Sequence, residues 1–487
     1  MHDVESFGLV IGAIGVAATL AVLSNRLGAR LRIPAPAFFL IGAAVASDLV
    51  PPLGRLSIET VQRVVTVALI VLLFDGGMHI GWRRFRSAAG AVLWIGTAGT
   101  FVTAGALAVL AHLLFGFGWE AALLIGTALA PTDPAVVFSV LGKREVSGRS
   151  GVLLEGESGA NDPVGIALMA GLMGVRAGGS VPAEAAAVAV EFALQMAVGA
   201  AVGVVGGVGL LAFMRRVPLP AEGLYPLRTL AGAAVIYGAA TAAHGSGFLA
   251  VFLAGILLGD QRAPYKREIE RFHASLASLS EIVAFSVLGL SVSLRSVWTE
   301  CAWLIGLALA ALLAFLVRPV LVGLLLLPVR LHRGERLFVL WAGLKGAVPI
   351  LLGTFVLTSG KPDGGRIYAI IFVVVAFSVL VQGSLVPSVA RWCGVPMRTV
   401  EPEPWALGMR FRSEPEGLQR YQVAKGSPAD GIAIRDLPLS EDRWISLVAR
   451  DGRLLPVRGE TVLRSGDEVL VLGDPAQGLD ALFNRPD

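Results

Sequence analysis

The stretch Ala130-Pro131-Thr132-Asp133-Pro134 is a polar tract inside one of the longest apolar runs of the sequence. Pro134 cannot donate a backbone hydrogen bond and its ring collides with the carbonyl of Ala130, while Pro131 removes another donor. We therefore expect the helix to be interrupted at Thr132-Asp133. Interrupted backbone at membrane depth is tolerated where it lines a cavity, and its free carbonyls can bind a cation beside Asp133. A plain proline kink held by the Thr132 hydroxyl is the alternative, although a kink has no need of the acid.

A second polar tract, Glu155-Gly156-Glu157-Ser158-Gly159-Ala160-Asn161-Asp162-Pro163, occupies the next apolar run. Glu157 and Asn161 are four residues apart, as are Ser158 and Asp162, so the two pairs form one patch on a helix. We expect Asp162 to bind a cation or a proton, Ser158 to supply an oxygen, and the Asn161 amide to brace Glu157. A set of oxygen ligands without His or Cys suits a hard cation and argues against zinc, copper or nickel.

A third tract, Trp341-Ala342-Gly343-Leu344-Lys345-Gly346-Ala347-Val348-Pro349, predicts a second interrupted helix in the other half of the chain, because Pro349 frees the carbonyl of Lys345. Two interrupted helices in separate halves indicate an inverted-repeat transporter with its site near the membrane midplane. Lys345 would place a positive charge between the two broken ends. The alternative is that Lys345 reaches the membrane surface, but its central position in the span disfavours this.

Two further charges, Asp75 and Arg318, are isolated among apolar residues and need partners. We predict that Arg318 pairs with Glu157 and that Asp75 pairs with Lys345. For Asp75, a position near a membrane face is the alternative.

The composition is that of a polytopic, all-α membrane protein. Of 487 residues, 55% are hydrophobic and only 16% are charged, and the mean hydropathy is +0.73. This is more apolar sequence than a soluble core can use. We expect about thirteen transmembrane helices, at approximately 7–24, 34–50, 59–78, 88–115, 119–142, 150–175, 185–214, 226–243, 246–260, 276–294, 301–328, 334–359 and 367–390.

The basic residues of the loops predict the orientation. They occur in every second loop, and the positive-inside rule then places the N-terminus outside and the C-terminus in the cytoplasm of a cell (inner or plasma) membrane protein. We expect contact with membrane lipid and no nucleic-acid binding, because the basic residues lie beside anionic lipid. These residues are Arg26/Arg30/Arg32, Arg83/Arg84/Arg86, Lys143/Arg144/Arg149, Arg215/Arg216/Arg228, Arg262/Lys266/Arg267/Arg271 and Arg330/Arg333/Arg336.

The composition changes after Pro396, where charge becomes dense and short alternating segments appear. Residues 444–448 and 468–472 are predicted strands, Asp451-Gly452 is a hairpin turn, and 480–483 ends a short helix. We therefore assign residues 1–395 to a transmembrane domain and 396–487 to a small cytoplasmic α+β domain.

The tail resembles the C-terminal subdomain of the modules that regulate potassium conductance (TrkA-C-like, RCK C-terminal). The resemblance rests on Gly426-Ser427-Pro428-Ala429-Asp430-Gly431, Arg435-Asp436-Leu437, residues 445–452 and Gly466-Asp467-Glu468-Val469-Leu470-Val471. It implies dimerisation and, in some members, a small regulatory ligand such as a nucleotide. Because the tail has no Gly-rich phosphate loop, a plain dimerisation module is equally favoured, and no other cofactor is expected.

The membrane region resembles the monovalent cation/proton antiporters, in particular the sodium/proton branch with an Asn-Asp pair and the potassium/proton antiporters linked to cell-volume control. The motifs are Thr132-Asp133-Pro134, Glu157-Ser158, Asn161-Asp162, Phe74-Asp75-Gly76-Gly77 and residues 343–349. The resemblance implies that Asp162 carries the cation and the proton, with Asp133, Ser158 and the Thr132 carbonyl as further ligands of a monovalent cation. Glu157, Asn161, Arg318, Lys345 and Asp75 would organise the site.

The same resemblance implies a homodimer, thirteen helices with a six-helix core that moves, two crossing interrupted helices, and electroneutral exchange serving pH, cation and volume homeostasis. Lys345 stands where the family commonly has Arg, and Lys cannot make the bidentate contacts that Arg makes in that motif. Ser158-Gly159-Ala160 replaces a bulkier sequence of sodium exchangers. Together with the tail, this favours K⁺ over Na⁺.

Two functions from other classes compete with antiport. A ligand-gated monovalent cation channel would pass current. An intramembrane aspartyl hydrolase could use two acids on neighbouring broken helices to activate water, but it needs neither Ser158 nor an opposing broken helix, and its Gly-x-Gly-Asp signature is absent. We therefore expect a transporter and not an enzyme.

Overall fold

The computed structural model describes Thr19 and residues 33–141, 144–146, 148–174, 181–261, 263–361, 363–399, 418–439, 443–450, 453–472 and 479–484. The chain divides into two compact units, Met1–Val400 and Glu401–Asp487, and each is described by itself. Apart from Thr19, the predicted first span at 7–24 lies outside the described residues, as do Arg26, Arg30 and Arg32.

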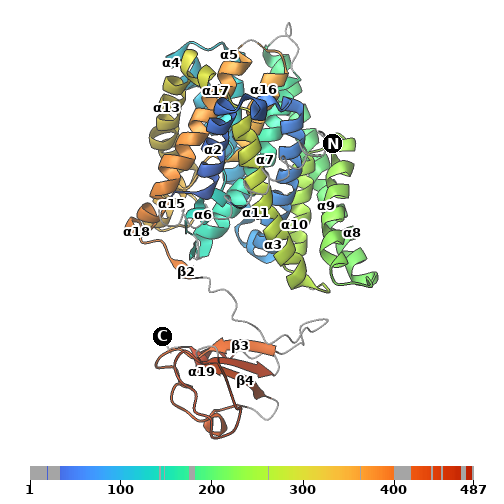
Figure 1. Ribbon diagram of the computed structural model, residues 1–487, viewed down its shortest axis with the longest axis vertical. Coiled ribbons are helices and arrows are strands. Elements are labelled where there is room, and N and C mark those ends of the chain that lie inside the picture. The colour runs from blue at the N-terminus through green and yellow to red at the C-terminus, as the bar shows by residue number, and fades with distance from the viewer. Residues whose placement is uncertain are drawn as a thin grey trace, which may run out of the picture. The chain divides into compact units, whose positions relative to one another are not determined.

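The first unit is a bundle of long helices (Figure 1), as its apolar composition requires. Its helices are α2 (Ala35–Leu49), η1 (Pro51–Arg55), α3 (Ile58–Trp94), η2 (Ile95–Gly99), α4 (Thr100–Phe115), α5 (Trp119–Leu129), α6 (Ala135–Leu141), α7 (Gly148–Met173), α8 (Val181–Arg216), α9 (Leu224–Ala242), α10 (Gly247–Gly259), α11 (Lys266–Leu290), α12 (Leu294–Thr299), α13 (Ala302–Leu312), η3 (Leu313–Val322), α14 (Gly323–Leu325), α15 (Arg333–Trp341), α16 (Ala347–Thr358), α17 (Gly364–Phe377), η4 (Ser378–Gly383) and α18 (Ser384–Trp392).

The unit is a multi-pass membrane protein. Among the described residues, five helical stretches are long and apolar enough to cross a membrane, namely Ile58–Phe115, Pro182–Arg216, Lys266–Leu290, Ala302–Leu325 and Gly364–Trp392. Shorter apolar helices, including α5 and α16, accompany them. The predicted spans 59–78 and 88–115 lie on the stretch Ile58–Phe115, and Gly81 separates them, because its backbone there is not helical, with φ of 65° and ψ of 162°.

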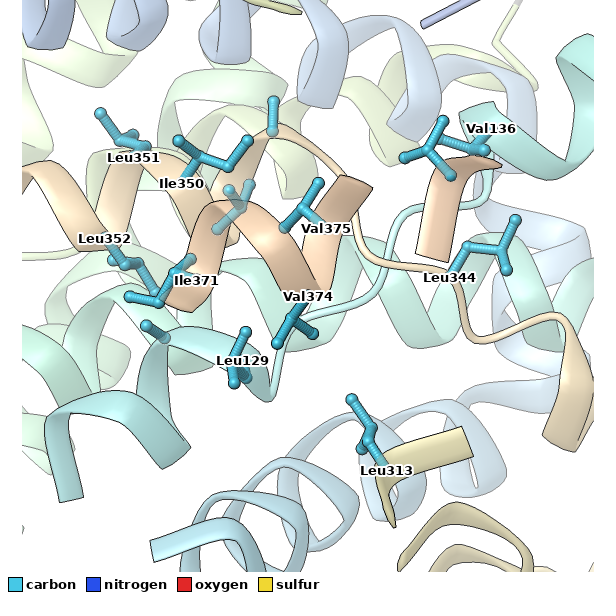
Figure 2. Close-up of a cluster of buried hydrophobic side chains, with 14 of the residues drawn as sticks. Leu129, Val136, Leu313, Leu344, Ile350, Leu351, Leu352, Ile371, Val374 and Val375 are labelled. Carbon is cyan, nitrogen blue, oxygen red and sulfur yellow. The ribbon is translucent and has the colours of Figure 1, made fainter. Parts of the chain in front are cut away.

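Both predicted interruptions are confirmed by the helix boundaries. The first lies between α5, which ends at Leu129, and α6, which begins at Ala135, and the second lies between α15 and α16. Figure 2 shows Leu129 and Val136 on the two halves of the first helix, and Leu344 on the irregular segment of the second interruption. All three side chains belong to the large buried apolar cluster of this unit, so the polar backbone of the breaks is enclosed by packed aliphatic side chains.

A short antiparallel ribbon joins two segments that are distant in the sequence. Strand β1 (Arg144–Val146) follows α6, and strand β2 (Met397–Thr399) follows α18, with Val146 opposite Met397. Residues 397–399 therefore pair with the membrane unit, a few residues beyond the boundary assigned from composition.

The second unit contains a four-stranded antiparallel sheet in the order β3-β6-β4-β5. Its elements are β3 (Leu418–Gln422), η5 (Ile434–Asp436), β4 (Trp444–Arg450), β5 (Arg453–Leu455), β6 (Glu468–Leu472) and α19 (Asp480–Phe483). The predicted strands and the short final helix are present. Arg450 pairs with the fully buried Asp467 at 2.7 Å, and Asp467 also accepts from the amide of Arg464, which holds the turn before β6.

Candidate functional site

The site is built around the extended residues of the first interruption. Helix α7 lies against this break and forms three hydrogen bonds with Thr132. The Thr132 amide donates to Asn161 Oδ1 at 3.2 Å, Asn161 Nδ2 donates to Thr132 Oγ1 at 2.7 Å, and Ser158 Oγ donates to the Thr132 carbonyl at 2.6 Å. The Thr132 carbonyl and Ser158 Oγ, two of the predicted ligand oxygens, are thus in direct contact.

Asp133 connects the two interruptions. Its amide donates to the Leu344 carbonyl at 2.8 Å, so the two broken segments are hydrogen-bonded to each other. Its carboxylate accepts from the amide of Ala135 at 2.8 Å and from the backbone of Ala347, the first residues of α6 and α16. One carboxylate therefore stands at the N-terminal ends of both half-helices, where their dipoles favour negative charge.

Gly346 is required by this arrangement. A Cβ at this position would overlap the Asp133 carboxylate. The absence of a side chain at Gly346 thus lets the acid reach the beginning of α16.

Asp162 is a buried acid for which the described residues provide no structural partner. It is 7% exposed, and its Oδ1 has no hydrogen-bond partner among the described residues. The charges of Asp133 and Lys345 both act on it. Because Asp162 lies one helical turn from Ser158, its free oxygen belongs to the same patch as the Thr132 carbonyl, and such an oxygen is available to a cation or a proton.

Lys345 neutralises the C-terminal end of α5. Its Nζ donates to the carbonyls of Ala130 and Pro131, each at 2.9 Å, and its own amide donates to Ser378 Oγ. The Ala130 carbonyl has no donor four residues on because that residue is Pro134, and the amide of Ala135 donates to Asp133 and not to Pro131, so the ammonium group satisfies both carbonyls. The predicted positive charge at the broken ends is therefore present.

Arg318 has the corresponding position at the end of α15. Its Nε donates to the Leu340 carbonyl at 3.0 Å and its Nη2 to the Val339 carbonyl at 3.3 Å. Nη2 also pairs with Glu157 Oε1 at 3.0 Å, which confirms the predicted ion pair. A Cβ at Gly343 would collide with the guanidinium group.

Two predicted contacts are wrong. Asn161 does not brace Glu157, because its amide is occupied by Thr132 while Glu157 is held by Arg318. Asp75 does not pair with Lys345. Its Oδ2 lies 3.3 Å from Nδ1 of His79, one turn further along α3, whereas Lys345 is satisfied by carbonyls.

Three positions were missed at the level of sequence. Gly346 leaves room for the Asp133 carboxylate, and Gly165 packs against the Pro131 ring. Gly156 and Gly159 of the second polar tract face Val92 and Phe252. Glu281 of α11 is a lone acid inside a predicted span, which was a usable signal. Its charge and that of Asp133 act on each other.

The site is suited to a hard monovalent cation and not to a transition metal. No group of three His, Cys, Asp or Glu side chains that could hold a metal ion occurs in the part of the chain that the structure describes. The groups at the first break supply oxygen only: a carbonyl, a hydroxyl and carboxylates.

Comparison with curated proteins finds relatives over nearly the whole chain. A K⁺/H⁺ antiporter NhaP of Alkalimonas amylolytica is 33% identical over 475 residues, which cover 96% of this chain and 82% of the relative. A K⁺/H⁺ antiporter NhaP2 of Shewanella sp. (strain MR-4) is 34% identical over 492 residues, which cover 99% of this chain and 83% of the relative.

Solved structures and family models agree with this. The sodium proton antiporter MjNhaP1 of Methanocaldococcus jannaschii has the same fold, with a TM-score of 0.65 and 22% identity, over 77% of this chain and 99% of that one. Residues 418–485 match the TrkA-C domain. Residues 9–392 match the transmembrane domain of sodium/hydrogen exchangers. The chain therefore belongs to the sodium/hydrogen exchanger family.

Proposed function

We propose that the protein is a secondary active antiporter that exchanges K⁺ or Na⁺ for H⁺ across the membrane. The observation that carries the proposal is Asp162, a buried acid with an unpartnered oxygen in a patch of oxygen ligands between two interrupted helices. A purely structural acid at this depth would be paired, as Glu157 is with Arg318. The names of the full-length relatives support the same activity.

Competition at Asp162 would couple the two ions. A carboxylate that binds a cation cannot hold a proton, and reorientation with only one of the two bound links their gradients. Ser158 Oγ and the Thr132 carbonyl are the proposed further ligands, together with Asp133. Because Asp133 already accepts from two amides, we assign it mainly to holding the half-helices in place. The cycle needs no cofactor.

The remaining features of the architecture are part of the proposal. Each interrupted helix ends in carbonyls held by a basic side chain, Lys345 for α5 and Arg318 for α15. This similarity supports an inverted repeat. We propose thirteen spans, crossing interrupted helices, a homodimer in the inner membrane in contact with lipid, an outside N-terminus and a cytoplasmic C-terminus.

We favour K⁺ as the cation, because the full-length relatives are named as potassium/proton antiporters and the tail is of the TrkA-C type. The tail would regulate transport, either as a dimerisation module or by binding a nucleotide.

The test is proton movement in everted membrane vesicles, followed with a pH-sensitive dye as KCl or NaCl is added. We expect K⁺ to dissipate the gradient with the wild-type protein and not with Asp162→Asn. Asp363→Asn is the matched control, because Asp363 is exposed and has φ of 60°, a conformation that Asn adopts readily.

Normal exchange by Asp162→Asn would remove Asp162 from the mechanism. If NaCl dissipates the pH gradient more strongly than KCl, the transported cation is Na⁺ and not K⁺. If neither salt dissipates the gradient but a cation current is recorded, the protein is a channel.

A further inference from the structure

Glu281 is a membrane-embedded acid that the site described above does not use. It lies within the apolar span formed by α11, four residues from the buried Ala277 and four from the buried Phe285. The residue is half-buried, yet its Oε1 is shielded and has no hydrogen-bond partner in the described part of the chain. A carboxylate at this depth costs several kcal/mol unless it faces a partner or a wet cavity.

The charge that acts on Glu281 is negative, so it cannot form a structural ion pair with this carboxylate. Asp133 is the neighbour whose charge is felt at this carboxylate, and two acids repel each other. Lys345 is engaged by the carbonyls of the first break, and Arg318 is engaged by the carbonyls of α15 and by Glu157, so neither neutralises Glu281. A cation between the two acids would remove this repulsion.

The packing of α11 connects Glu281 to the site. This helix packs against α2, α3 and α16, and α16 begins at the backbone that holds the Asp133 carboxylate. Figure 1 shows α11 beside α3 within the bundle. An acid on α11 that acts on Asp133 is thus close to the ligand oxygens without belonging to either interrupted helix.

We propose that Glu281 is an intermediate binding position for the transported monovalent cation, from which the ion passes to the oxygens at Asp133 and Asp162. The proposal rests on the antiport function proposed above. The cation would bind by ordinary carboxylate–cation attraction and would be released without any bond being made or broken. Loss of this position should weaken cation capture and leave the exchange step at Asp162 intact.

The test measures exchange in everted vesicles against cation concentration for Glu281→Gln. We expect the half-saturating K⁺ concentration to rise by about tenfold, which corresponds to about 1.4 kcal/mol, while the rate at saturating K⁺ stays near that of the wild type. Glu281→Asp keeps the carboxylate and should give an intermediate value. Glu270→Gln removes an acid from the beginning of the same helix, where it pairs with Lys266 at the surface, and should change neither quantity.

An unchanged half-saturating concentration in Glu281→Gln would overturn the proposal, whether or not the maximal rate falls, because a structural role lowers only the maximum. If Glu281→Gln does not assemble in the membrane, Glu281→Asp provides the test. A half-saturating K⁺ concentration equal to that of the wild type would then count against the proposal. Cation-dependent thermal stabilisation of the purified proteins gives a second measurement: stabilisation should need more K⁺ in Glu281→Gln and should vanish in Asp162→Asn. Absence of exchange in the wild type would instead defeat the antiport function itself.

Discussion

Glu157 and Arg318 form the best-defined charged pair of the site, but Arg318 does more than neutralise an acid. Its guanidinium also donates to the carbonyls of Val339 and Leu340 at the end of α15. The pair therefore links α7 to the second interruption, and the planar fork of Arg is suited to three acceptors at once.

Exchanging the charges of Glu157 and Arg318 tests whether the carbonyl contacts of Arg318 matter as well as its ion pair. We predict that Glu157→Arg and Arg318→Glu each destabilise the protein by roughly 3–5 kcal/mol, because each leaves a buried charge unpaired. The double swap should recover little, since a glutamate at position 318 would face the two carbonyls that Arg318 now satisfies. Thermal unfolding in detergent measures this. Recovery to wild-type stability would show that the carbonyl contacts are unimportant.

The sequence predicted this pair but not its neighbours, for a physical reason. Two isolated membrane charges of opposite sign must find each other, so Arg318 and Glu157 were readily matched. The Asn161 amide had two geometrically equal options, Glu157 on its own helix or Thr132 across the break, and only the packing of α7 decides between them. For Asp75, His79 one turn away was a local partner that the sequence contained.

At the scale of elements, the two interruptions form one unit. The amide of Asp133 is bonded to Leu344, and its carboxylate holds the first residues of α6 and α16. The prolines predicted where each helix ends. They could not predict that the breaks contact each other, because that contact depends on the absence of a side chain at Gly346.

We predict that Gly346→Ala lowers the exchange rate by roughly tenfold or more, or about 1.4 kcal/mol, because the new Cβ displaces the Asp133 carboxylate. Gly365→Ala is the matched control. A Cβ there meets open space near the beginning of α17, so the substitution should be neutral or slightly stabilising. Equal rates for both variants in the vesicle assay would contradict the proposed role of Gly346.

The β1–β2 ribbon was not predicted at all. Each strand has three residues, which is too short for an alternating pattern to be recognised. The ribbon joins the segment that leads to the tail to the segment that follows α6.

At the scale of the whole molecule, the ribbon changes where the tail should be cut. A chain ending after Val400 loses only the second unit, whereas one ending after Pro396 also loses β2. We predict that the longer chain retains exchange, and that the difference from the intact protein gives the sign of regulation by the tail. The shorter chain should exchange more slowly, because β1 has lost its partner. Equal rates of the two truncated proteins in vesicles would show that the ribbon has no part in transport.

Composition was sufficient to predict a helical membrane unit followed by a small α+β tail, because hydropathy and strand alternation are local properties. The helix boundaries were less predictable. The position of the break between the spans expected at 59–78 and 88–115 is an example: it lies at Gly81, where a Cβ would overlap the side chain of Asp260, a contact between residues far apart in the sequence.

The two cations at the broken helix ends have a consequence for the response to membrane potential. With Asp133, Glu157 and Asp162 ionised, the positive charges of Lys345 and Arg318 leave this buried group with one net negative charge. One bound monovalent cation or one bound proton neutralises it equally. In the proposed one-for-one exchange, both loaded forms would carry the same charge through the electric field, so the field would do no net work over a cycle. Exchange should accordingly proceed at the same equilibrium ratio in polarised and depolarised cells.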